Sequence, residues 1–152
     1  MADKTNMILL RGDGTHEEGK AVAAGILPGM VVERQSTGVL DFNQPQDAQA
    51  EALKVAPVIV KEDPYQGNLI TTEYANGARL FLYIPDNGNR LHMLVKSGET
   101  VEIGDRFVVE GGGSGLLVEA AGAETRYAFE AVEDSGGALA ENKHIKFEYR
   151  QG

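Results

Sequence analysis

The sequence has no cysteine and no tryptophan, and its basic residues are few. The absence of cysteine excludes disulfide frameworks, thiolate nucleophiles and zinc sites built on cysteine. Without tryptophan, and with only five tyrosines and five phenylalanines, nothing indicates the aromatic-lined cleft of a carbohydrate-cleaving enzyme. Lysine and arginine total 14 against 23 aspartates and glutamates, a net charge of −9. A field of that sign repels phosphate, so we expect neither nucleic acid nor a membrane surface as a partner.

Long apolar runs are also missing. The first such run, Met7–Leu10, is shorter than a secretory signal requires. No stretch approaches the ~20 apolar residues of a membrane span. We therefore expect a soluble protein that stays where it is made. A length of 152 residues fits one domain, or two small β units that share a core.

Glycine is abundant, and its 19 residues fall between short apolar runs. This spacing predicts a mainly β fold, a compact barrel or sandwich with at most one or two short helices. The clearest strand is Lys143–Arg150, where apolar and charged residues alternate. A short helix is expected at Gln46–Lys54, after Pro45. The other expected strands are Met30–Arg34, Val39–Phe42, Pro57–Lys61, Leu80–Ile84, Arg90–Lys96, Arg106–Glu110, Leu116–Ala120 and Arg126–Glu133.

Turn signals and a faint internal repeat add detail. Asn87-Gly88, within Pro85–Asn89, predicts a hairpin between the strands on either side of it. Three segments in the first half resemble three in the second: Pro28–Glu33, Gly38–Leu40 and Val58–Asp63 resemble Gly104–Glu110, Gly115–Leu117 and Phe129–Asp134. Chance similarity among β-hairpins explains this as well as a true repeat does. We expect residues 1–25 to form an N-terminal arm and tether, followed by one β domain at 26–152 or two similar units at about 26–85 and 98–150.

No motif predicts catalysis. The loop Gly111–Gly115 leads into the strand-like Leu116–Val118 rather than into a helix, so it reads as a hairpin loop and not as a phosphate-binding loop. His16, His92 and His144 are far apart in the sequence and lack metal-ligand spacing. His92 and His144 fall on the polar side of expected strands, where we expect them to be solvated. We therefore expect no enzyme, no catalytic residue, no metal and no cofactor.

The N-terminal segment is the best candidate for a binding element. Arg11-Gly12-Asp13 spells a cell-adhesion tripeptide, but an Asp-Gly turn explains it without a receptor. The segment before it is a short apolar strand, followed by a stretch rich in Gly and Glu. Such a strand can add to a neighbour's sheet, or it can be the ordinary first strand of its own domain. The candidate contact residues are Thr5, Asn6, Met7, Ile8, Leu9, Leu10 and Arg11.

The order of segments resembles one known family. The residues that carry the likeness are Ala21–Glu33, Gly98–Val109, Tyr127–Gly136 and the final strand Ile145–Tyr149. Over most of residues 21–150 this arrangement is similar to the head decoration (cement) proteins of tailed bacteriophages. The segments Gln44–Lys54 and Asp63–Gly77 depart from that pattern.

The resemblance implies a β-tulip-like fold with an extended N-terminal arm and a non-enzymatic role. A decoration protein is made in the host cytoplasm and binds the outer surface of the assembled head, where it clamps neighbouring major capsid protein subunits. The resemblance also implies self-association as a homotrimer. The alternative function is a carbohydrate- or receptor-binding β module on a virion or cell surface. In that case exposed aromatic side chains such as Tyr65 or Tyr74 would contact the ligand.

Overall fold

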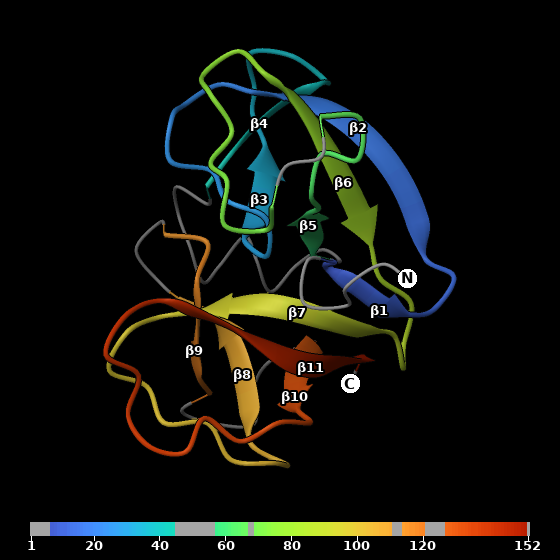
Figure 1. Ribbon diagram of the computed structural model, residues 1–152. Helices are drawn as coiled ribbons and strands as arrows, with labels where there is room; N and C mark the ends of the chain where they lie inside the picture. The colour runs from blue at the N-terminus through green and yellow to red at the C-terminus, as the bar shows by residue number, and fades with distance from the viewer. Residues whose placement is uncertain (1–6, 45–56, 67–68, 111–113, 121–126, 152) are drawn as a thin grey trace.

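The chain folds into β-strands in the computed structural model, which describes residues 7–44, 57–66, 69–110, 114–120 and 127–151 (Figure 1). No helix occurs in these ranges, and so none there could cross a membrane. The helix expected at Gln46–Lys54 lies outside the described residues. The prediction of a mainly β, barrel-like fold is confirmed.

Five consecutive strands form the first barrel. They close in the order β2-β4-β3-β5-β6. Every neighbouring pair is antiparallel except β2 and β4, which run parallel where Lys20 and Ala21 lie beside Asp41 and Phe42. The strands are β2 (Thr15–Ala21), β3 (Val31–Arg34), β4 (Asp41–Asn43), β5 (Val58–Val60) and β6 (Arg79–Ile84).

The next five strands form the second barrel. They are β7 (Arg90–Val95), β8 (Arg106–Val109), β9 (Leu117–Glu119), β10 (Tyr127–Ala131) and β11 (Lys143–Gln151). Their order is β7-β11-β10-β8-β9, and a parallel pairing of β7 with β9 closes the ring. A sixth strand, β1 (Leu9–Arg11), adds to the free part of the β7 edge. The strands that flank the Gly111–Gly115 loop, β8 and β9, pair antiparallel, as expected for a hairpin.

The two barrels have the same topology. In each, the first strand of the five pairs in parallel with the third and antiparallel with the fifth. The segments that resemble each other in the sequence fall at equivalent places, on or beside β3 and β8, β4 and β9, and β5 and β10. An equivalent strand edge therefore exists in each barrel, and the two edges can be compared directly.

A shared core joins the barrels. Val31, Ile59 and Tyr83 lie side by side across β3, β5 and β6, and they belong to the buried cluster that fills the second barrel. Their neighbours Val32, Val60 and Leu82 point the other way, into the separate core of the first barrel. Because successive side chains point to opposite faces of a strand, these strands are apolar on both faces.

Two expectations were wrong about the seam, the region where the two barrels pack against each other. The Asn87-Gly88 turn does not close a hairpin, because β6 and β7 belong to different barrels; Gly88 instead donates a hydrogen bond to the carbonyl of Tyr149. Nor do His92 and His144 lie in solvent. His92 is buried, and His144, which is half-buried, bonds through Nε2 to the carbonyl of Pro28 at 2.8 Å. The part of β7 and β11 that carries His92 and His144, which the sequence pattern assigns to water, is covered instead.

Candidate binding surface

In the expected N-terminal contact segment, Leu9–Arg11 forms the edge strand β1 (Figure 1). Thr5 and Asn6 lie outside the described residues. In the rest of the segment, Leu9 pairs with Leu91 of the same chain, and the amide of His92 donates to the carbonyl of Ile8 at 2.8 Å. The side chain of Ile8 is fully buried in the shared core. The segment is thus the first strand of its own sheet in this structure.

Contacts on both sides fix β1. The amide of Ile8 donates to Glu62 at 3.0 Å, and Nδ1 of His92 bonds to the carbonyl of Met7 at 2.9 Å. Because a carbonyl oxygen can only accept, this bond places a proton on Nδ1 of His92. These groups tie β1 to the first barrel as well as to the second.

Within the described ranges no strand lies beside the outer edge of β1, because β1 is the last strand of its sheet. Residues on an antiparallel strand alternate in the direction of their backbone hydrogen bonds. Since Ile8 bonds to β7, the amide and carbonyl of Leu9 point away from β7. Unpaired backbone groups of this kind are a template for a strand of another protein.

Beside β1, three arginines surround one carboxylate. Glu148 lies on the outer face of β11 and is only 6% exposed. Its carboxylate contacts Arg11 at 3.1 Å, Arg90 at 3.3 Å and Arg150 at 2.5 Å, and Arg150 also contacts Glu130 at 3.3 Å. The arginines come from β1, β7 and β11, so Glu148 ties three adjacent strands together. Arg11, part of the cell-adhesion tripeptide, is held in this cluster.

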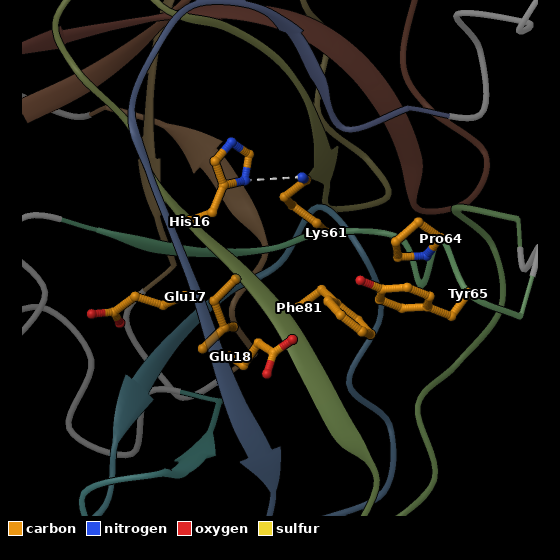
Figure 2. Close-up of a pocket in the computed structure, with 8 residues that line it drawn as sticks. His16, Glu17, Glu18, Lys61, Pro64, Tyr65 and Phe81 are labelled. Atoms are coloured by element: carbon orange, nitrogen blue, oxygen red, sulfur yellow. Dashed lines mark hydrogen bonds between the residues drawn. The ribbon is translucent and has the colours of Figure 1, made fainter.

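A second surface lies on the outside of the first barrel, where two hollows meet at Tyr65. Figure 2 shows the residues that line the first of them. The first has a volume of about 400 Å³ and is lined by β2, β6 and the loop after β5. The second, of about 540 Å³, lies on the other side of Tyr65 and includes Glu73 and Arg79. Both are in the size range of ligand sites, although both are open to solvent.

Tyr65 is presented by a hydrogen-bonded turn. The buried carboxylate of Asp63 accepts hydrogen bonds from the amides of Tyr65 at 2.9 Å and Gln66 at 3.3 Å. The ring lies 5.5 Å from that of Phe81 and is 81% exposed. Tyr74, the other aromatic expected at the surface, is instead buried, with its hydroxyl donating to the carbonyl of Lys61 at 2.7 Å.

His16 and Lys61 form the rim of the first hollow. Nδ1 of His16 lies 3.1 Å from Nζ of Lys61, as Figure 2 shows. Burial, and then the charge of Lys61, lower the pKa of His16 below its usual value. The imidazole is therefore neutral at pH ~7, with Nδ1 accepting from the ammonium group. Glu18 projects toward Phe81, whereas Glu17 leaves β2 on the opposite side.

The sequence pattern indicated one of these two surfaces but not the other. The apolar run Met7–Leu10 marked β1, but the Tyr65 turn lies in a polar stretch that a single sequence does not mark as a site. Within the described ranges, no three histidine or acidic side chains are grouped to hold a metal ion. Comparison of the sequence with protein-family models finds no matching family, and a search of the curated proteins finds no matching relative.

Proposed function

We propose that the protein is a non-enzymatic capsid decoration protein that binds the outside of an assembled phage head. In this role it is made in the host cytoplasm, associates as a homotrimer and clamps neighbouring major capsid protein subunits. The observation that carries the proposal is the open edge of β1, where the backbone of Leu9 points away from the chain's own sheet. The resemblance of residues 21–150 to decoration proteins supports the same role.

Such a clamp acts through linkage. A protein that binds the assembled shell but not free coat subunits stabilises the shell by RT ln(1 + [L]/Kd) at each site. At a free concentration about one hundred times Kd, this amounts to about 2.7 kcal/mol per site. Three binding surfaces on one trimer add avidity to modest single contacts.

The test uses purified full-length protein and expanded heads that lack it. We expect the protein to sediment with the heads and to raise the temperature at which they disrupt. Leu9→Pro removes the outward amide and should weaken binding, whereas Ile103→Ala, at an exposed apolar residue of the second barrel, should not. Absence of co-sedimentation by the wild-type protein would exclude the role. A monomer by light scattering would exclude the trimeric form of it.

Tyr65 favours carbohydrate binding as a second candidate function. Its exposed ring, which contacts that of Phe81, offers a flat apolar face, and the second hollow beside it contains Gln66, Glu73 and Arg79, which can bond hydroxyl groups. Glycan-array binding that is lost in Tyr65→Ala and kept in Tyr65→Phe would support this function. A blank array would argue against it.

A further inference from the structure

The shared topology of the barrels allows their edges to be matched residue by residue. The parallel contact that closes the second barrel pairs Val95 with Leu117, and the one that closes the first pairs Ala21 with Phe42. The next amides behave alike: Lys96 donates to Leu117 at 3.0 Å, and Val22 donates to Phe42 at 3.1 Å. Val95 and Ala21 are therefore equivalent positions.

Counting back along both strands makes Glu18 the counterpart of His92. In the second barrel this part of the edge is filled, because the amide of His92 donates to the carbonyl of Ile8, the residue before β1. In the first barrel, β4 reaches only Lys20 and Ala21. Among the described residues, no strand therefore fills the position on β2 that corresponds to the place of β1 on β7.

The backbone groups of this β2 edge point outward. The amide of Lys20 donates to Leu40, on the side of β4, whereas that of Ala21 donates to Ala78, on the side of β6. Because these directions alternate along a strand, the amides and carbonyls of His16 and Glu18 point away from β6. Among the residues that the structure describes, none hydrogen-bonds to these groups.

We propose that the His16–Glu18 edge accepts an extended strand from a partner protein, and that the strand carries a lysine or arginine opposite Glu18. Main-chain hydrogen bonds to such an edge supply affinity, and a neighbouring pocket for one side chain supplies specificity. Here that pocket is the first hollow. Glu18 provides a carboxylate for a charge-assisted bond, and the rings of Phe81 and Tyr65 provide faces for a cation.

The second barrel shows that a side chain on an added strand can reach across the neighbouring strand to the one beyond it. Arg11 on the added strand β1 crosses Arg90 on β7 to reach Glu148 on β11 at 3.1 Å. A basic side chain on a strand added to β2 must likewise cross one strand to lie over Phe81, which is directly opposite Glu18 on β6.

The basic residues near Glu18 do not prevent a partner's lysine or arginine from binding to its carboxylate. Glu18 has an ion pair with Arg79 at 4.0 Å, and both side chains are more than half exposed. An exposed pair of this kind contributes little, so a partner's cation can replace it. Lys61 is turned toward His16. This site goes beyond the decoration role, since it requires a basic strand and not a coat protein.

The test uses the isotope-labelled full chain and two synthetic peptides of equal length. One peptide alternates Thr and Val with Lys, and the other replaces each Lys with Glu. We expect the basic peptide to shift the amide resonances of His16 and Glu18, and the acidic peptide to shift neither. Glu18→Lys should weaken the basic peptide at least about tenfold, a loss of about 1.4 kcal/mol. Glu102→Lys makes the same change of net charge on the second barrel and should leave the affinity unchanged.

A second variant tests the backbone hydrogen bonds of the β2 edge rather than a reversal of the charge of Glu18. Glu18→Pro removes an outward amide, and proline is tolerated on an edge strand at such a position. It should weaken the peptide while the melting temperature stays near that of the wild type. Equal weakening by Glu102→Lys, or no shift at His16 and Glu18 at millimolar basic peptide, would overturn the proposal. Binding of saccharides but of neither peptide would overturn it too, in favour of the second candidate function. None of these outcomes depends on capsid binding.

Discussion

Removing the charge of Glu148 tests how the edge strand is held to the second barrel. Glu148→Gln keeps the shape of the side chain but replaces a carboxylate that three arginines contact at 2.5 to 3.3 Å. A hydrogen bond to a charged group contributes about 1.5–3 kcal/mol net. The arginine side chains are 43–60% exposed, so water replaces much of what each of them loses. We therefore expect a total loss of about 2–3 kcal/mol in the free energy of unfolding, well below the sum of three buried bonds.

The matched control is Glu130→Gln. Glu130 lies beside Glu148 on the next strand and contacts Arg150 alone among these arginines, at 3.3 Å, with 38% of its side chain exposed. Loss of an exposed pair costs ~1 kcal/mol or less. The two variants make the same chemical change on the same face and differ mainly in burial and in the number of arginines.

Urea denaturation followed by far-ultraviolet circular dichroism is the suitable assay, because the chain has no tryptophan to report on unfolding. For a chain of this size, each kcal/mol lowers the melting temperature by about 2–4 °C. Glu148→Gln should therefore melt about 5–10 °C below the wild type. If Glu148→Gln is no less stable than Glu130→Gln, the cluster does not hold the strands together and the reasoning fails.

Three further predictions concern the seam. Tyr83→Phe removes a hydroxyl that bonds to both Asn89 and the amide of Gly14, each at 2.5 Å; we expect a loss of about 1–3 kcal/mol in urea denaturation, and an unchanged midpoint would contradict it. Gly29→Ala should cost at least about 2 kcal/mol, since φ is +91° and a Cβ would lie 2.9 Å from His144; wild-type stability would show that the seam can yield. Burial lowers the pKa of His144 below 6.5 in the folded protein. As the pH drops below about 6.5, His144 therefore takes up a proton more readily in the unfolded chain than in the folded one, and the free energy of unfolding decreases. His144→Gln should flatten the slope of stability between about pH 7 and 5, and an unaltered slope would count against this.

Much of the fold follows from local patterns. Strands such as β6 and β11 are marked by apolar or alternating residues, and the turns by glycine. Strand β2 is not marked, because only Gly19 and Ala21 of its residues are buried and neither is a typical strand former. The parallel closures of the barrels join residues far apart in the chain, and no local pattern encodes them.

The packing of the two barrels against each other could not be predicted, for a different reason. A turn motif such as Asn87-Gly88 fixes how the backbone bends, but not whether the strands beside it pair. Alternation likewise shows that His92 and His144 share one side of the sheet, but not that another barrel covers that side. Tyr65 could not be singled out, since its exposure depends on the buried turn at Asp63.

The seam also explains why the two barrels offer different surfaces although their topology is the same. On the second barrel, β1 fills the free edge of β7, and the outward-facing His92 and Leu94 are buried where the first barrel packs. On the first barrel, no strand of the described ranges pairs with the equivalent edge of β2 along His16–Glu18, and the outer face bears Tyr65. One copy of the unit uses its edge and face in internal packing, whereas in the other copy no part of the described chain covers either. Binding by this protein should therefore depend on the β2 edge and the Tyr65 surface of the first barrel, and on the outer edge of β1 where the second barrel ends.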